Sequence, residues 1–223
     1  MRAFELAKTA GADGLEFDVR LDGDGNVIVF HDQTLERMLH RPTRLDEMSA
    51  AERATVRIDG EPIPLLSEVL DTYELELDIE IKADRIGRTG ALVEAVAKLI
   101  AEHRRNDRVM VSSFDPFTLL QVHRRLPDIA LAYIFHGEQA LPLRRGWFGR
   151  WIGASLVHPQ STLCTEARIK AWHTAGLPIN AWTVDDDDEL RRLYALGVDG
   201  VFANDPAHAL TVLSAAAASP PRT

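Results

Sequence analysis

Charged residues recur in pairs on two short segments that have the composition of strands. Glu16 and Asp18 are two positions apart, and Glu80 and Lys82 repeat that spacing farther along the chain. Residues two apart on a strand point to the same side of the sheet. Each segment can therefore present two charged groups on one face, where the groups of two strands can meet.

These residue types favour chemistry on a phosphate ester. Carboxylate oxygens are the ligands that Mg²⁺ and Ca²⁺ prefer, and a lysine can hold an anionic oxygen. His31 follows the apolar run 27–30 directly and can transfer a proton near neutral pH. A metal site, a lysine and a histidine together indicate metal-assisted attack on phosphorus. The structural alternatives are exposed strand carboxylates, a structural histidine, and a lysine that only pairs with Glu80.

The elements that must position these residues alternate between strands and helices. Apolar patterns predict strands at 14–19, 77–82, 108–112, 129–134, 154–157, 178–183 and 199–202. Helices are expected at 2–10, 66–73, 88–105, 116–125, 165–175 and 186–196. Repeated βα units predict an α/β fold of the TIM (β/α)8 type, with the strand ends gathered at one mouth. A doubly wound sheet is the alternative, although no Gly-x-Gly-x-x-Gly turn supports it.

The intervening segments are less regular. Asp24-Gly25 predicts a hairpin before the run 27–30, and the polar stretch 33–63 is expected to be mostly loop. The barrel is expected to occupy 1–213, and the Ala- and Pro-rich tail 214–223 is expected to be disordered. Asp185 is expected to cap the helix that follows it.

Composition limits the kind of partner. A net charge of −9 argues against nucleic acid, which proteins hold mainly through clustered lysine and arginine. No apolar run approaches the ~20 residues that a membrane span requires. Cys164 is the single cysteine, which favours a cytoplasmic location. A small-molecule ligand is therefore expected.

Several motifs follow one another in order along nearly the whole chain. They are Gly11-Ala12-Asp13-Gly14-Leu15-Glu16-Phe17-Asp18-Val19, Asp24-Gly25, His31-Asp32, Ile63-Pro64-Leu65-Leu66, Ile79-Glu80-Ile81-Lys82, Ser112-Ser113-Phe114, Ala181-Trp182-Thr183-Val184, Gly197-Val198-Asp199-Gly200-Val201 and Asn204-Asp205-Pro206. In order and spacing they closely resemble the glycerophosphodiester phosphodiesterase family, part of the phosphatidylinositol-phospholipase-C-like phosphodiesterase superfamily. The resemblance implies hydrolysis of a glycerophosphodiester to glycerol 3-phosphate and an alcohol.

The resemblance also implies roles for individual residues. Glu16, Asp18 and Glu80 would bind the divalent metal, Mg²⁺ or Ca²⁺. His31 would protonate the departing alcohol, and Lys82 would contact the phosphate. Trp182 would line the mouth against the apolar part of the substrate. The attacking group would be the glycerol 2-hydroxyl, an intramolecular reaction favoured by proximity.

One departure from the family pattern affects these expectations. Family members begin with a strand that ends in His-Arg-Gly, whereas this sequence starts at Met1-Arg2-Ala3-Phe4, inside the first helix. We therefore expect seven parallel strands, with 14–19 and 199–202 left unpaired, and impaired activity of this chain. The rival functions are a non-catalytic barrel that binds metal or phosphate esters and a phospholipase D-like lyase, and association into a homo-oligomer is an open expectation.

Overall fold

Strand β1 (Gly14–Leu21) organises the main sheet. It pairs in antiparallel fashion with β2 (Val27–Val29) and in parallel with β3 (Glu76–Ile81). The parallel order continues through β4 (Val109–Ser113), β5 (Ala130–Phe135) and β6 (Leu156–Pro159). Strands β7 (Asn180–Ala181) and β8 (Gly200–Val201) pair with each other, and parallel bridges join β6 to the β7 region. The computed structural model describes residues 1–83, 88–105, 107–141 and 148–218.

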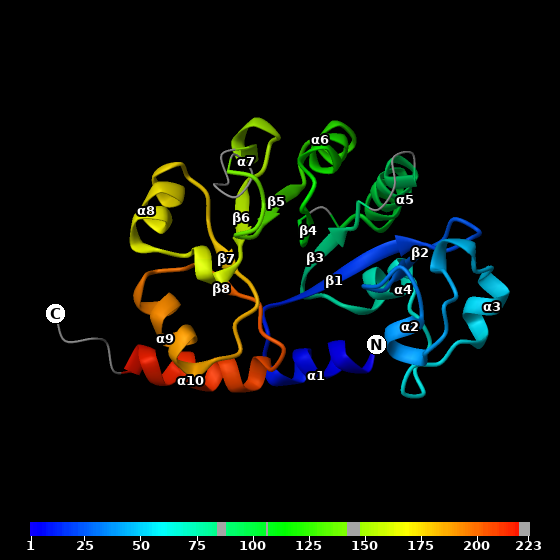
Figure 1. Ribbon diagram of the computed structural model, residues 1–223, viewed down its shortest axis with the longest axis horizontal. Helices are drawn as coiled ribbons and strands as arrows, with labels where there is room; N and C mark the ends of the chain where they lie inside the picture. Colours follow the sequence, from blue (N-terminus) through cyan, green and yellow to red (C-terminus); the bar gives the residue numbers. More distant parts are fainter. Residues whose placement is uncertain (84–87, 106, 142–147, 219–223) are drawn as a thin grey trace.

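Helices surround the outside of this curved sheet (Figure 1). They are α1 (Arg2–Ala10), α4 (Leu66–Thr72), α5 (Arg88–His103), α6 (Pro116–Arg125), α7 (Phe148–Trp151), α8 (Glu166–Thr174), α9 (Asp187–Ala195) and α10 (Pro206–Ala218). A short 3₁₀ segment, η3 (Ser161–Leu163), follows β6. None of the described helices is both long enough and apolar enough to cross a membrane.

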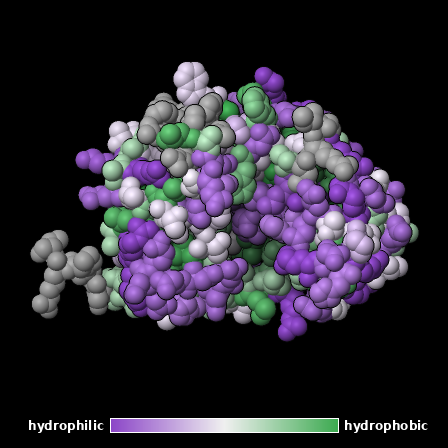
Figure 2. Space-filling view, viewed as in Figure 1, coloured by the Kyte–Doolittle hydropathy of each residue, from purple (hydrophilic) through white to green (hydrophobic). Residues whose placement is uncertain are grey.

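The barrel has one open side. Within the described residues, seven strands run parallel, and β1 and β8 form no pair with each other. The space-filling view shows the surface hollowed between the β7–β8 side and the part that contains β2 (Figure 2). The fold is therefore a TIM-type α/β barrel that is not closed, as the sequence predicted.

The alternation along β1 and β3 separates apolar from charged side chains. Leu15, Phe17 and Val19 are buried in the main core, and β3 contributes Leu77 and Ile79 to the same core. The intervening positions of both strands carry acids, and they therefore point to the opposite face, the inside of the barrel. Burial of the apolar face fixes this orientation because a one-residue slip would place charge in the core.

Residues 22–65, which include β2, form a lobe with its own hydrophobic cluster. It contains α2 (Glu36–Leu39), the 3₁₀ helix η1 (Leu45–Glu47) and α3 (Ala50–Thr55). Its buried members are Ile28, Leu35, Leu45, Met48, Val56 and Ile63. The expectation of mostly loop holds for the larger part of 33–63, but it missed these three helices, which are too short to show a periodic pattern. The capping box of Ser49 and Glu52 was the available signal for α3.

Two local boundaries also differ from those expected. Asp186, not Asp185, caps α9, since its side chain accepts a hydrogen bond from the backbone N–H of Glu189. Asp185 instead accepts from Asn204. Helix α10 runs to Ala218, so residues 214–218 of the expected tail are helical, and 219–223 lie outside the described residues.

Asp22 ties the β1–β2 turn to the lobe. Its side chain is fully buried and accepts hydrogen bonds from the backbone N–H groups of Asp24 and Asn26, at 3.1 and 2.8 Å. The Arg53 guanidinium lies 3.2 Å from the same carboxylate, and Arg53 is itself largely buried. The carboxylate therefore joins a turn and a helix that are distant in sequence.

We expect Asp22→Ala to lower the free energy of unfolding by about 3 kcal/mol, because Arg53 would keep a buried charge without its partner. Asp24→Ala is the control, since Asp24 is exposed and accepts one hydrogen bond, from the backbone of Ala50. It should cost about 1 kcal/mol. Urea unfolding measures both, and equal losses would contradict the anchoring role of Asp22.

Candidate active site

Three carboxylates gather inside the barrel. The register of β1 and β3 places Asp18 beside Glu80, with Glu16 two positions earlier on β1. One oxygen from each of these three residues lies within 4.8 Å of the others. The sequence-predicted metal ligands are thus brought together by two neighbouring strands. Three hard oxygen donors at this spacing fit a divalent cation such as Mg²⁺ or Ca²⁺.

Lys82 is held by two of these acids. Its Nζ lies 2.7 Å from Asp18 Oδ1 and 2.5 Å from Glu80 Oε1. The ion pair with Glu80, the structural alternative for Lys82, is thus present together with a second one. Burial lowers the pKa of Lys82, but the negative charges of Glu80 and Asp18 outweigh it, so the pKa lies above its usual value. The ammonium is charged and neutralises part of the acidic cluster.

One lysine does not balance the acids around it. Desolvation, followed by the charges of Asp18, Asp78 and Glu80, raises the pKa of Glu16 from 4.5 to about 9. Glu16 is exposed at the open side of the barrel, so its desolvation is incomplete. A bound cation would relieve the part of the pKa shift that comes from repulsion by the neighbouring acids. Burial is also the main cause of the raised pKa of Glu80. The cluster holds excess negative charge that favours a cation.

Asp78 lies next to this cluster and was not predicted. It is 5% exposed, and burial is the main cause that raises its pKa to about 7. His158 Nδ1 lies 3.3 Å from Asp78 Oδ2, and burial lowers the pKa of His158 to about 3, so this imidazole is neutral. The signal in the sequence was the spacing of two positions between Asp78 and Glu80.

His31 stands at the edge of the mouth. Its side chain is 63% exposed, and its Nδ1 lies 2.7 Å from Asp32 Oδ1. Arg37 donates to the other oxygen of Asp32 at 2.6 Å. Slight burial raises the pKa of Asp32, but these hydrogen bonds outweigh it and lower the pKa. An ionised Asp32 can orient the ring and leave Nε2 directed to a substrate.

Arg20 connects His31 to the strand that carries the acids. Its Nε and Nη2 donate to the backbone carbonyl of His31 at 2.8 and 2.6 Å. Arg20 is buried and lies two positions after Asp18, on the same face of β1. Arg20, which was not predicted, therefore ties the backbone of His31 to the strand that carries Glu16 and Asp18.

Aromatic side chains form the opposite wall of the mouth. The Trp182 indole donates to the carbonyl of His158 at 2.8 Å, which fixes the ring. Phe114 packs edge-on against Trp182 and His136, with ring centroids 5.5 and 5.8 Å apart. Lys82 Nζ lies 5.9 Å from the centroid of Phe114. Trp182, Phe114 and His136 thus form one aromatic wall, and Phe114 brings this wall close to Lys82.

The fold and the site define an α/β barrel with an acidic site on its inner face. Comparison of the sequence with known families identifies which family of such barrels this is. The profile of the Glycerophosphoryl diester phosphodiesterase family matches residues 1–208. The chain belongs to this family. A glycerophosphodiester phosphodiesterase of Bacillus altitudinis is 30% identical, over 95% of this chain and 91% of the relative. That of Caldanaerobacter subterraneus subsp. tengcongensis is 28% identical, over 92% and 87%.

Solved structures show the same fold. A phosphodiesterase of Oleispira antarctica in complex with the product sn-glycerol-3-phosphate is 24% identical and has a TM-score of 0.84, covering 94% of this chain and 88% of that one. A glycerophosphodiester phosphodiesterase of Parabacteroides distasonis is 21% identical and also has a TM-score of 0.84, covering 97% and 90%. These similarities establish the TIM-type barrel.

The acidic cluster predicts a specific pH dependence of stability without metal. Because the folded chain holds a proton on Glu16 that the unfolded chain releases above 4.5, the free energy of unfolding should fall as pH rises from about 4.5 to about 9. Asp78 and Glu80 act in the same direction. Glu16→Gln should flatten this dependence when urea unfolding is measured between about pH 6 and about pH 8.5.

Glu76→Gln serves as the control, because Glu76 is exposed at the other end of β3. It should leave the slope of stability against pH unchanged. A slope in Glu16→Gln as steep as in the parent would show that Glu16 is not the strained carboxylate.

Proposed function

We propose that this chain hydrolyses glycerophosphodiesters to glycerol 3-phosphate and an alcohol with a divalent metal bound at Glu16, Asp18 and Glu80. The observation that carries the proposal is the meeting of these three oxygens within 4.8 Å beside Lys82. Carboxylates this close repel one another, and a divalent cation relieves that repulsion. The names of the relatives point to the same reaction.

Each residue of the mouth is assigned a different role in the reaction. A bound metal ion would supply positive charge to the phosphate oxygens. Glu16, Asp18 and Glu80 would hold the ion, and the ammonium of Lys82 beside them would donate to a phosphoryl oxygen. This donation stabilises charge that develops as the new P–O bond forms. Trp182 packs against the carbon face of the glycerol and limits its orientations.

His31 is assigned the proton transfer to the leaving alcohol. Its exposed ring lies at the mouth, and Asp32 holds the ring at Nδ1. Nε2 would give its proton to the alcohol oxygen as the P–O bond to that oxygen breaks, while the glycerol 2-hydroxyl attacks phosphorus and loses its proton to solvent water. Water would then open the resulting cyclic phosphate, which yields glycerol 3-phosphate and returns a proton to His31. Asp32 would keep the ring oriented through Nδ1 during these transfers. Arg20 would act as a positioning residue, because it holds the backbone of His31.

A second candidate function is a non-catalytic protein that binds metal or phosphate esters. The observation that favours it is the open side of the barrel, where β1 and β8 have no described pairing with each other. An open side loosens the site, and small displacements of catalytic groups are costly. Three expectations stay predictions: that the ion is Mg²⁺ or Ca²⁺, that the protein is cytoplasmic, and that it forms a homo-oligomer.

The test is release of glycerol 3-phosphate from a glycerophosphodiester with Mg²⁺ or Ca²⁺ and after chelation. We expect metal-dependent release, and we expect His31→Asn and Glu80→Gln each to lower kcat by about 10²-fold or more. Glu76→Gln, on the same strand as Glu80, should retain the parent rate. Metal binding without any release would support the non-catalytic alternative, and metal-independent release would contradict the proposal.

A further inference from the structure

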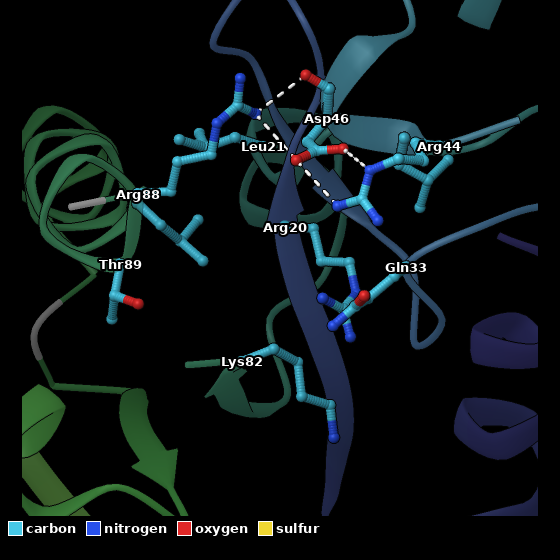
Figure 3. Close-up of a pocket in the computed structure, with 10 residues that line it drawn as sticks. Arg20, Leu21, Gln33, Arg44, Asp46, Lys82, Arg88 and Thr89 are labelled. Atoms are coloured by element: carbon cyan, nitrogen blue, oxygen red, sulfur yellow. Dashed lines mark hydrogen bonds and ion pairs between the residues drawn. The ribbon is translucent and has the colours of Figure 1, made fainter. Parts of the chain in front are cut away.

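A basic hollow lies beside the acidic cluster and shares Lys82 with it. Its volume is about 40 Å³, room for about three water molecules or a small polar group. Figure 3 shows Lys82, Arg20 and Gln33 on one side of the hollow, and Arg44, Asp46 and Arg88 at its far end. The remaining lining residues are Leu21, Leu45, Thr89 and Leu92.

Positive charge dominates the lining. The lining residues include three arginines and Lys82 but one acid, Asp46. Arg44 donates to both oxygens of Asp46, at 2.9 and 3.0 Å, and Arg88 donates to its backbone carbonyl at 2.9 Å. Arg88 also lies 3.5 Å from the Asp46 carboxylate, and Arg44 lies 3.5 Å from that of Glu47. These acids hold both arginines at the edge of the hollow, where further guanidinium N–H groups can donate to a ligand. Guanidinium groups fixed in this way are suited to bind a carboxylate or a phosphate.

The position of the hollow relates it to the leaving alcohol. Arg20, which lines it, also holds the carbonyl of His31, the residue assigned to protonate that alcohol. Lys82 lines it as well and lies within 2.7 Å of the proposed metal ligand Asp18. A phosphate bound at the acids would thus place its alcohol substituent next to the hollow.

The lining also disfavours a cationic alcohol. Proteins recognise quaternary ammonium groups with aromatic faces, and the residues that line the hollow include no aromatic side chain. The nearest aromatic wall, at Phe114, already faces the ammonium of Lys82 at 5.9 Å. A choline-like group would therefore be repelled by the positive charge of the hollow, and the ammonium of Lys82 already lies against the ring of Phe114.

We propose that this hollow, through Arg44 and Arg88, binds an oxyanion carried by the leaving alcohol and so selects glycerophosphodiesters whose alcohol bears a carboxylate or a second phosphate. The inference rests on the proposed function, since it assumes that a diester occupies the neighbouring acidic site. It adds to that function the chemical class of the alcohol, which metal, lysine and histidine do not determine.

The experiment compares two diesters that differ in one group. Glycerophosphoserine and glycerophosphoethanolamine both carry an ammonium, and only the first carries a carboxylate. Titration calorimetry with Ca²⁺ present should show the serine diester binding about 10-fold more tightly, since a charge-assisted hydrogen bond is worth about that factor. In Arg44→Gln/Arg88→Gln the two affinities should agree within about twofold. Where the diesters turn over, the ratio of kcat/KM values replaces the ratio of affinities.

Arg125→Gln is the matched control. Arg125 is also a partly exposed arginine paired with an acid, Glu94 at 2.6 Å, but it lies on α6 outside the hollow. This variant should keep the preference for serine. A third diester, with a phosphate in place of the carboxylate, separates the two sources of the oxyanion by showing which is bound more tightly.

The outcomes separate the two proposals. Equal binding of both diesters to the parent chain, or a serine preference that survives in the double variant, would overturn the role of the hollow and leave the proposed function standing. Absence of both binding and turnover for every diester would overturn the proposed function and this inference with it. A collapse of the preference in Arg125→Gln as well would show a general effect of charge and would also overturn the assignment.

Discussion

The site depends on electrostatic repulsion among acids that the sheet forces together. The parallel register of β1 and β3 places Asp18 beside Glu80 and Glu16 beside Asp78. Lys82 relieves part of this repulsion, but desolvation, and after it the charges of Asp18, Asp78 and Glu80, still raise the pKa of Glu16 to about 9. A fold can keep acids this close only where other interactions contribute more to stability than the repulsion costs. Clusters of like charge with perturbed pKa values are typical of functional sites.

The interactions that outweigh it lie on the other face of the same strands. Leu15, Phe17 and Ile79 are buried against the helices, and this apolar packing holds the register that brings the acids together. After the β1–β2 turn the chain runs back along β1 in the antiparallel direction. His31 follows β2, and the Arg20 side chain fixes its backbone carbonyl by two hydrogen bonds. Stability and chemistry thus occupy opposite faces of one strand pair.

The same separation explains what could be predicted from the sequence. Spacing of two positions identified Glu16, Asp18, Glu80 and Lys82, because side-chain direction on a strand is a local property. The bond from Arg20 to His31 was not predictable in this way, since it depends on how β2 pairs with β1. The helices of the lobe were missed because their apolar residues form a cluster only after the chain folds back on itself. The local signal for α3 was the capping box that begins at Ser49.

The most direct test of this account is calorimetric titration of the metal-free protein with Mg²⁺ or Ca²⁺ at about pH 7.5, in two buffers of different protonation enthalpy. Because Glu16 holds a proton at this pH, the account predicts binding of one ion with release of a proton, and loss of that binding in Glu80→Gln. Binding that persists unchanged in Glu80→Gln, or no binding at all, would contradict the claim that the strained carboxylates form a metal site.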